Sequence, residues 1–353
     1  MTPAEARKRF PVLAHCAYLN AGSVGPLSRR TAEAMHGAET HSLEHGRASA
    51  SIWEAAAASE TRLKEHLAAM IKAPVEKVVL TTSTTEGCNI VVSALRLGPD
   101  DEVVTTNAEH PGLMLPLVAS GVRIRQANVM ARPQGEALQA ILDEVSPKTK
   151  LVALSHVLWL NGHVLPLAEI KRDTGLPLLV DGAQSVGAIP VDATVADWYT
   201  VSGQKWLCGP ETTGALFVND HESLRPQIQS YAASARQDAG RLALVHLSHA
   251  MTAGLLAAVE EFPEWGFERA AEMVAYCRGA MVAAGFEVRT APDQGTLISF
   301  RIAGDPVAIV KGAEAKRVVI RSLPDGWLRA SIGWWTDRTD VDQLIEVMLA
   351  AAA

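Results

Sequence analysis

The chain has 353 residues, of which 48% are hydrophobic and 20% are charged, and its formal net charge is −7. This composition is ordinary for a folded protein and excludes extended disorder. The length predicts a core that is divided between two domains, because single cores stop growing at about 250–300 residues. The negative charge and the absence of a basic cluster argue against a nucleic-acid partner.

The cellular setting is predicted from the ends and the cysteines of the chain. The first residues, MTPAEARKRF, carry charges where a secretory signal needs an apolar core, and no window has the roughly 20 apolar residues of a membrane span. We therefore expect no membrane association. The four cysteines are far apart and form no CxxC pair, which argues against a structural zinc site or a disulfide framework and favours the cytoplasm. They are Cys16, Cys88, Cys208 and Cys277.

The first motif, AYLNAGSVGP at residues 17–26, is typical of a short strand that runs into a glycine-rich loop. Gly22 and Gly25 leave backbone amides exposed in this loop, which suits a ligand carboxylate, although a tight turn explains the same residues. A helical pattern follows from Thr31 to about Ile71. His41 and His45 share a face of it, and without a partner motif they indicate a solvated surface and no metal site.

A run of hydroxyl residues follows the predicted strand at residues 78–80. TTSTTEG, residues 81–87, leads into a predicted helix at residues 88–95. Hydroxyls, free amides and the helix dipole together can bind an anion. One capping threonine would also be an ordinary helix start. The run does not match GxxxxGK[ST], so it does not predict a nucleoside triphosphate site.

Three further predicted strands, at residues 102–106, 151–155 and 177–180, each precede a polar or aromatic candidate. His110 follows the first, Trp159 the second and Asp181 the third. A carboxylate directly after an apolar strand lies at the carboxyl end of a parallel sheet, where open α/β folds bind ligands. Asp181 is either a helix cap or the partner of a buried cation. His110 is either a loop histidine or a plate beside a ligand ring.

The stretch ADWYTVSGQKWLCGPETTG, residues 196–214, contains a single lysine, Lys205, after an apolar strand. A desolvated ammonium is costly, so this lysine snorkels, pairs with a carboxylate or gives up its proton. In the last case it is a nucleophile that can form a Schiff base. A partly exposed loop lysine is the plainer alternative.

The strand and helix alternation predicts an α/β fold with a mostly parallel central sheet between helices, followed by a smaller α+β domain at the C-terminal end. Arg329 lies on a predicted strand of that domain and could bind a carboxylate, or be an ordinary surface arginine. We predict an N-terminal segment at residues 1–30 that contributes to the site mouth and small domain, a large domain at 31–235 and the small domain at 236–353.

Seven motifs in order resemble the class V aminotransferase group of fold type I pyridoxal-phosphate (PLP) enzymes. They are YLNAGSVGP, TTSTTEGCN, EHPG, SHVLWLNG, VDGAQSVG, SGQKWLCGP and LRAS. The group includes cysteine desulfurases, isopenicillin N epimerase and cyst(e)ine C–S lyases. The resemblance implies PLP as the cofactor, an amino acid as the substrate and a homodimer.

The resemblance also implies roles for single residues. Lys205 resembles the lysine that forms the Schiff base with the cofactor, Asp181 the carboxylate at the pyridine nitrogen and His110 the imidazole on the ring. Gln184 resembles the residue at the phenolic oxygen, and Arg329 the one that binds the substrate carboxylate. Asn20, Gly22 and Trp159 are expected near the substrate. The predicted phosphate-binding residues are Thr84, Thr85, Ser202 and Gln204.

The chain departs from the desulfurase pattern, and this shapes the predicted activity. No cysteine follows Cys277, so a persulfide-forming desulfurase is disfavoured, and Gln204 replaces a histidine. Trp159 replaces an asparagine. The short SLPDG connection resembles C–S lyases, so we predict Cα deprotonation by Lys205 followed by β-elimination. An aminotransferase, an epimerase or a non-catalytic binding protein are the alternatives. We also expect the pocket walls to come from the loop at residues 21–26 and from Trp159, Trp206, Trp334 and Trp335.

Overall fold

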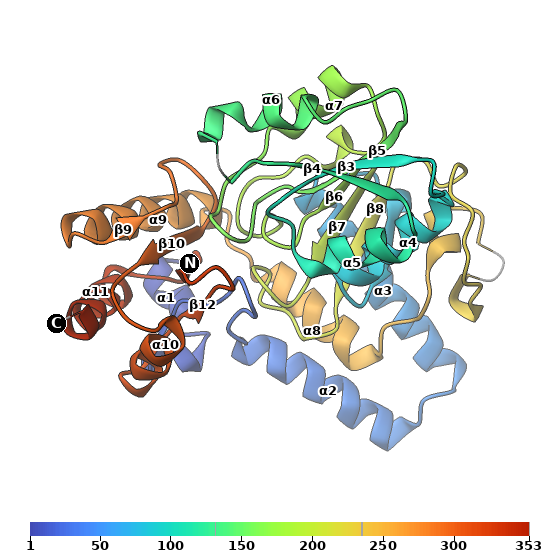
Figure 1. Cartoon of the computed structure of the whole chain (residues 1–353). Coiled ribbons are helices and arrows are strands. Elements are labelled where there is room, and N and C mark those ends of the chain that lie inside the picture. Colours follow the sequence, from blue (N-terminus) through green and yellow to red (C-terminus); the bar gives the residue numbers. More distant parts are fainter. Residues whose placement is uncertain (131, 234–235, 353) are drawn as a thin grey trace.

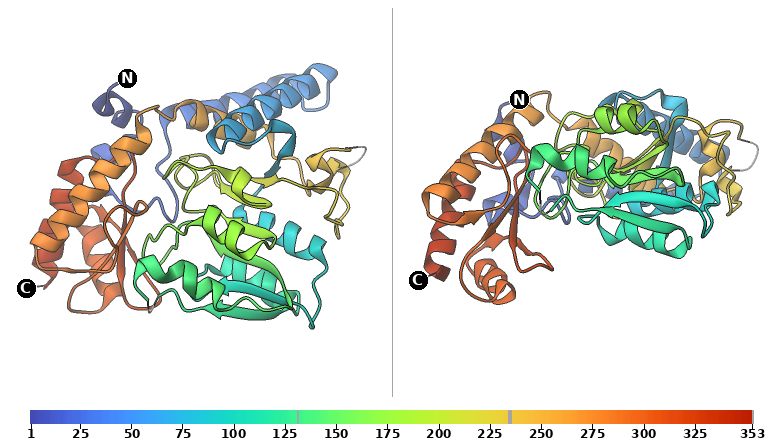
Figure 2. Two further views of the ribbon diagram at one scale, coloured as in Figure 1. Left: turned by 90° about the horizontal axis from the view of Figure 1, so that it is seen from above. Right: turned by 45° about the horizontal axis from the view of Figure 1, so that its top comes forward.

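The fold of this computed structural model is built on two sheets with helices around them, and the structure describes residues 1–130, 132–233 and 236–352. Figure 1 shows the larger sheet on one side of the molecule, with the C-terminal helices and both chain ends on the other. The two further views in Figure 2 show the same separation.

The larger sheet has seven strands in the order β2-β8-β7-β6-β5-β3-β4. β8 runs antiparallel to β2 and β7, and the other neighbours are parallel, so the predicted mostly parallel sheet is confirmed. The sequence analysis did not identify β4 or β8. The strands are β2 (Val78–Thr81), β3 (Glu102–Thr106), β4 (Arg123–Ala127), β5 (Thr149–Ser155), β6 (Leu178–Asp181), β7 (Trp198–Ser202) and β8 (Gly214–Val218).

Side chains that alternate along these strands fill two cores, one on each face of the sheet. Leu179 packs with α4 and α5 on one face, while its neighbour Val180 packs with α3, α6, α7 and α8 on the other. This is why the inner strands, such as β6, are largely apolar, as expected for a sheet that is covered on both sides. The helices are α3 (Ala50–Met70), α4 (Thr84–Leu95), α5 (Pro111–Ala119), α6 (Ala137–Leu142), α7 (Leu167–Thr174) and α8 (His249–Glu260).

The continuous helical pattern predicted from Thr31 to Ile71 is wrong in one respect, because the structure contains two helices there. α2 (Arg29–His45) ends at Gly46, whose φ of 82° leaves the helical region. α3 then begins after Ser49, whose side chain accepts a hydrogen bond from the Ile52 amide. A glycine stop and a serine cap are the local signals that separate helices. α2 packs along α8.

The smaller sheet has four strands in the order β12-β13-β10-β9, and it carries Arg329 on β13. Both ends of the chain contribute to this part, because β1 (Ala17–Tyr18) pairs in parallel with β11 (Val318–Val319). The remaining strands are β9 (Glu287–Val288), β10 (Leu297–Arg301), β12 (Arg321–Ser322) and β13 (Leu328–Ser331). The remaining helices are α1 (Pro3–Arg7), α9 (Gly266–Ala283), α10 (Pro306–Ala315) and α11 (Arg338–Ala352).

The predicted domain limits stay a prediction. The buried apolar residues do form separate clusters, one of which joins Ala17 and Leu19 to β10, β13, α9 and α11. The predicted boundary after residue 235 and the end of the last domain at residue 353 lie outside the described residues.

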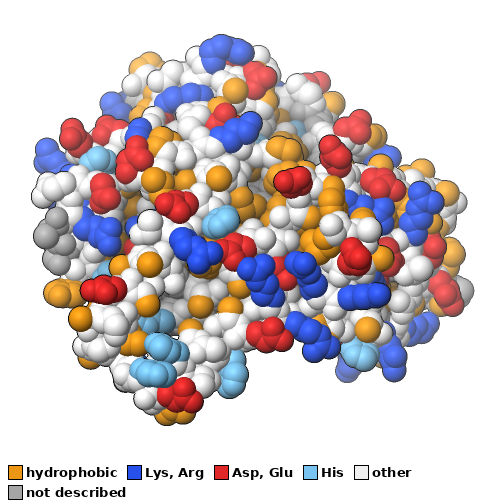
Figure 3. Space-filling model, turned by 180° about the vertical axis from the view of Figure 1, so that it is seen from behind, with side chains coloured by type: hydrophobic (Ala, Val, Ile, Leu, Met, Phe, Trp, Pro, Cys, Tyr) orange, Lys and Arg blue, Asp and Glu red, His pale blue; other side chains and the backbone are white. Residues whose placement is uncertain are grey.

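The surface in Figure 3 has basic and acidic side chains interspersed, with histidines gathered near one end. His41 and His45 of α2 stack at 4.4 Å between ring centroids.

Within residues 1–130, 132–233 and 236–352, no group of three or more His, Cys, Asp or Glu side chains could hold a metal ion. No helix in these ranges is long and apolar enough to cross a membrane.

An ion pair connects the first helix to the last and yields a prediction of stability. Arg7 donates to both carboxylate oxygens of Asp340, at 2.6 and 2.7 Å, and the Asp340 side chain is only 5% exposed. Arg7→Ala leaves that carboxylate buried without its cation. Because Arg7 is itself partly exposed, we expect a loss of about 2–3 kcal/mol in the free energy of unfolding, measured with urea.

The matched control is Arg172→Ala, which breaks an exposed pair with Asp173. We expect no measurable change in that variant, because exposed ion pairs contribute little. An equal response of the two variants would contradict a structural role of the Arg7–Asp340 pair.

Candidate functional site

The candidate site is a cavity of about 260 Å³ between the carboxyl ends of the large sheet and strands β12 and β13. The structure brings ten of the twelve predicted site residues to its walls. They are Gly22, Thr84, Thr85, His110, Trp159, Gln184, Ser202, Gln204, Lys205 and Arg329. The other two predicted residues, Asn20 and Asp181, do not line this space.

Lys205 follows β7, and its buried environment makes the ammonium less stable than in water. Burial lowers its pKa from 10.5 to about 8, an effect that Asp181 opposes and that Arg329 and Arg321 strengthen. The ammonium has no hydrogen bond or ion pair with any residue that the structure describes. A desolvated lysine with a lowered pKa is suited to act as a nucleophile or base.

Asp181 is the last residue of β6 and is buried behind the cavity wall. Its Oδ1 accepts hydrogen bonds from the Ala183 amide, at 2.9 Å, and from the Thr200 hydroxyl, at 3.4 Å. Its Oδ2 has no partner among the described residues. The charge of Asp181 opposes part of the lowering that burial causes in the pKa values of Lys205 and His110.

His110 is held as the N-cap of α5. Its Nδ1 accepts a hydrogen bond from the Gly112 amide at 3.0 Å, which requires that nitrogen to be unprotonated. Burial and then the charge of Lys205 lower the pKa of His110. The ring meets Trp159 edge to face at 5.2 Å. His110 is therefore a fixed, neutral ring at the wall of the cavity.

The hydroxyl residues around the start of α4 have two roles. Some stabilise the helix start, and others have hydroxyl groups without a hydrogen-bond partner among the described residues. Thr82 and its amide bind the Glu86 carboxylate, and Ser83 caps the helix by accepting from the Glu86 amide. The helix begins at Thr84, four residues before the predicted start. The hydroxyls of Thr84 and Thr85 have no partner among the described residues and lie at a helix N-terminus that lines the cavity. This arrangement suits a phosphate group.

Gln184 is oriented by its neighbours on both ends of the amide. Its Oε1 accepts from the Trp206 indole at 3.0 Å, and its Nε2 donates to the Gly22 carbonyl at 2.9 Å. One N–H of Gln184 is left for a ligand. Trp206, Trp334 and Trp335 do not line the cavity as predicted, because they are buried in an aromatic cluster with Phe10. Trp206 positions Gln184 from behind.

Arg329 is fully buried, and its charge is not balanced. Its Nη1 donates to the Trp159 carbonyl at 3.0 Å, while Nε and Nη2 have no partner among the described residues. Burial lowers its pKa, and the nearby Arg321 adds to this effect. A buried guanidinium without a carboxylate is costly, so this group is arranged to receive an anion.

The sequence analysis missed Arg321, which also lines the cavity together with Ser23 of the predicted loop and Ser83 of the hydroxyl run. Arg321 lies directly opposite Arg329 in the β12–β13 pair, its Nη1 donates to the Ser23 hydroxyl at 3.2 Å, and its guanidinium lies 5.7 Å from the Trp159 ring. The register of β12 against β13 would have identified Arg321, but a sequence pattern does not contain that register.

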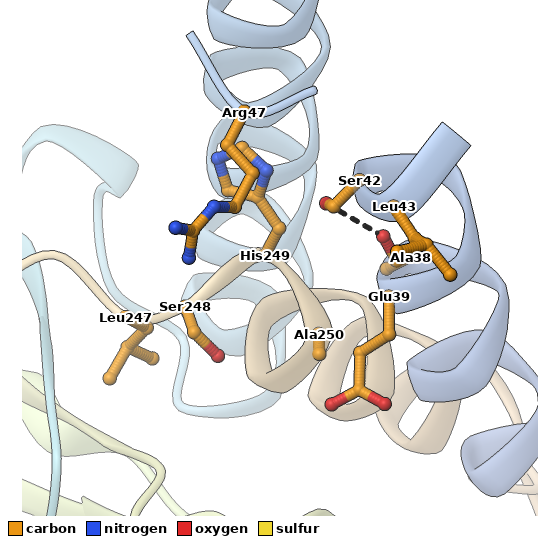
Figure 4. Close-up of a pocket in the computed structure, with 9 residues that line it drawn as sticks. All are labelled: Ala38, Glu39, Ser42, Leu43, Arg47, Leu247, Ser248, His249 and Ala250. Atoms are coloured by element: carbon orange, nitrogen blue, oxygen red, sulfur yellow. Dashed lines mark hydrogen bonds between the residues drawn. The ribbon is translucent and has the colours of Figure 1, made fainter. Parts of the chain in front are cut away.

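A larger hollow of about 670 Å³ lies between the end of α2 and the start of α8, and it contains none of these groups. Figure 4 shows Glu39, Arg47 and His249 around it, with the Ser42 hydroxyl bonded back to its own helix at Ala38. The side chains around the larger hollow are therefore those of an ordinary protein surface. The convergence of Lys205, His110 and two arginines distinguishes the smaller cavity.

Comparison with known proteins agrees with this geometry. A family model described as aminotransferase class-V matches residues 22–237. A probable cysteine desulfurase of Methanothermobacter thermautotrophicus is 32% identical over 227 residues, which are 62% of this chain and 57% of that protein. Isopenicillin N epimerase of Streptomyces clavuligerus is 30% identical over 65% of this chain and 60% of that protein. These matches span less than two thirds of either relative.

Solved structures match over nearly the whole chain. The cystine C–S lyase C-DES in complex with cysteine persulfide has a TM-score of 0.92 and 27% identity, over 96% of this chain and 99% of that one. A C-DES mutant with glycine covalently linked to its PLP cofactor matches equally well, with 97% and 98% coverage. An apo cysteine desulfurase of Thermococcus onnurineus, at 0.88 and 19% identity, shares the fold. The predicted fold is confirmed.

The loop that contains Gly22 and Gly25, called the mouth loop below, contacts the backbone at Lys205, and this contact can be tested. The Gly25 amide donates to the Gln204 carbonyl at 2.7 Å, and a Cβ on Gly25 would lie 2.0 Å from the Lys205 carbonyl oxygen. We expect Gly25→Ala to displace the loop and to cost about 2 kcal/mol of stability, measured as a fall in Tm. Gly37→Ala, on an open face of α2, is the control and should leave Tm equal or higher. Equal Tm values for the two variants would contradict the tight contact.

Proposed function

The chain belongs to the aminotransferase class-V family, and from this premise we propose that it is a lyase that removes a sulfur group from the β-carbon of an amino acid. It is a PLP-dependent enzyme of that family. The observation that carries the proposal is a reactive lysine and an unpaired buried arginine in one cavity. The first suits proton abstraction at Cα, and the second suits a substrate carboxylate.

The residues present fit the cofactor. The free hydroxyls at the start of α4 suit its phosphate, and the unoccupied Oδ2 of Asp181 suits its ring nitrogen. When bound, PLP supplies an electron sink for the bond that breaks at Cα. We propose the following residues as its binding site: Thr84, Thr85, His110, Asp181, Gln184, Ser202, Gln204 and Lys205.

Two groups of the chain would act on the substrate directly. The Lys205 amine, with its lowered pKa, accepts the Cα proton and holds it at Nζ. Arg329 binds the α-carboxylate through the nitrogens that are left without a partner. The reaction consumes one water and converts R–S–CH₂–CH(NH₃⁺)–COO⁻ into a thiol, pyruvate and ammonium.

The cavity walls favour elimination over sulfur transfer to the protein. None of the described residues that line the cavity is a cysteine, and Cys88, Cys208 and Cys277 are buried elsewhere. The structural similarity to the cystine lyase C-DES supports the same choice. Because Arg321 adds a second cation beside Arg329, we propose that the preferred substrate has a second acidic group.

We retain the homodimer as a proposal. Leu115 and Val118 are 64% and 59% exposed on α5, the helix that His110 caps. A second copy that covers this face would remove apolar surface from water close to the site.

The activity is tested by a screen of cysteine, cystine and S-substituted cysteines with the PLP-loaded protein. We expect pyruvate release, detected with a lactate dehydrogenase couple. Turnover only with an added keto acid would indicate an aminotransferase, and solvent deuterium exchange at Cα without pyruvate would indicate an epimerase. A protein that binds PLP without any of these reactions would overturn the proposal.

The two arginines are distinguished by substitution. We expect Arg329→Met to raise KM about 100-fold or more for every substrate, since it removes the partner of the α-carboxylate. We expect Arg321→Met to raise KM at least tenfold for cystine and S-carboxymethylcysteine and to leave S-methylcysteine unaffected. Equal effects of Arg321→Met on all three substrates would contradict a second acid site.

The pH dependence of Lys205 labelling gives a further prediction. Because its pKa is lowered to about 8, the fraction of neutral amine rises about tenfold per pH unit below 8 and is constant above it. The rate at which the apoprotein is labelled by PLP, trapped with borohydride and located by mass spectrometry, should follow that profile. Lys205→Ala is the control without label at this site. A rate that still rises at pH ~10 would show an ordinary lysine.

A further inference from the structure

Two side chains at the start of the mouth loop form a hydrogen-bond chain that ends on Arg321. The Arg321 Nη1 donates to the Ser23 hydroxyl at 3.2 Å, and that hydroxyl donates to Oδ1 of Asn20 at 2.9 Å. A serine hydroxyl has one proton and two lone pairs, so the bond to Asn20 uses the proton and leaves the lone pairs for the guanidinium. Asn20 therefore orients Ser23 as an acceptor for Arg321.

Backbone bonds attach this chain to both parts of the fold. The Ser23 amide donates to the Asn20 carbonyl at 2.9 Å, which closes a turn at the start of the loop. Asn20 forms a parallel bridge with Ser331 at the end of β13. At the other end of the loop, the Gly25 amide donates to the Gln204 carbonyl, which follows β7. Ser23 therefore lies on a segment that is held at both ends.

This support matters because Arg321 has no carboxylate partner. Within residues 1–130, 132–233 and 236–352, its guanidinium forms no ion pair, and its other contact is the Trp159 ring at 5.7 Å. Arg329 is its Cα partner across the β12–β13 pair, so two like charges lie side by side. Repulsion and the many rotamers of a partly exposed arginine both favour a guanidinium that turns toward solvent. The Ser23 hydroxyl opposes that movement.

We propose that Ser23, oriented by Asn20, is a positioning residue that holds Arg321 at the cavity wall and so sets the preference for a substrate with a second acidic group. This rests on the proposed function, in which Arg321 binds that group. A substrate with the α-carboxylate alone needs only Arg329 and is indifferent to Ser23. Because Ser23 itself lines the cavity, direct contact with the ligand is the competing explanation that the experiment has to exclude.

The test measures binding to the PLP-loaded protein by calorimetry, with adipate and hexanoate as ligands. Adipate has the same spacing between its carboxylates as S-carboxymethylcysteine, hexanoate lacks one of them, and neither has an amino group that could react. We expect the wild type to bind adipate at least about tenfold more tightly. Ser23→Ala should lose most of that ratio, and Ser23→Thr, which keeps a hydroxyl, should retain it. Ser42→Ala, which removes a hydroxyl bonded to the Ala38 carbonyl, is the control and should also retain it.

A double-mutant cycle separates positioning from direct contact. If Ser23 acts through Arg321, Ser23→Ala should change the adipate ratio in the wild type and leave it unchanged in Arg321→Met. Equal effects in the two backgrounds would show that Ser23 binds the ligand itself and would overturn the inference. Asn20→Ala should lower the ratio in the same direction and should also have no effect in Arg321→Met. A ratio that Asn20→Ala leaves at the wild-type value would overturn the role of Asn20.

The outcomes separate this inference from the proposed function. A wild type that binds adipate and hexanoate equally would overturn the inference, whereas the pyruvate assay would still report elimination. A ratio that persists in Ser23→Ala would also overturn it and would leave the second acid site to Arg321 alone. A protein that loses the ratio in Ser23→Ala but releases no pyruvate from any substrate would support the inference and overturn the lyase activity.

Discussion

The cavity is dominated by positive charge that the protein itself does not neutralise. Its described walls contain Lys205, Arg321 and Arg329 and no carboxylate, and Asp181 lies behind them. Desolvation makes the charges of Lys205 and Arg329 costly, and repulsion from Arg321 adds to the cost. Anionic ligands would stabilise a site of this kind. The phosphate of the proposed cofactor, and the α-carboxylate and second acidic group of the proposed substrate, each match one part of it.

The positive groups come from two separate parts of the fold. The large sheet positions Lys205 after β7, and the small sheet places both arginines opposite each other on β12 and β13. The mouth loop joins them, because Gly25 contacts the backbone of Lys205 while Gly22 contacts Gln184. The chemistry therefore depends on packing between parts as much as on any one motif.

Much of this was predictable from local sequence. Apolar strands followed by Asp181 or Lys205 place those residues at one edge of a parallel sheet, and the ordered motifs predicted the family. Arg321 was missed because its place depends on strand register, which is decided by contacts far along the chain. The helix break at Gly46 has a local signal that the alanine-rich pattern concealed. Trp206, Trp334 and Trp335 were predicted as pocket walls, but they are buried against Phe10. That contact joins distant parts of the chain, so a local sequence pattern does not predict it.

The pairing of β1 with β11 brings together segments about 300 residues apart. During synthesis on the ribosome, β1 emerges about 300 residues before β11 and has no partner until β11 has been made. The large sheet can therefore fold around Lys205 before either arginine of the small sheet exists. Newly made chains would pass through a stage in which the lysine is open to solvent, and the cationic chamber forms only once the small sheet has been made.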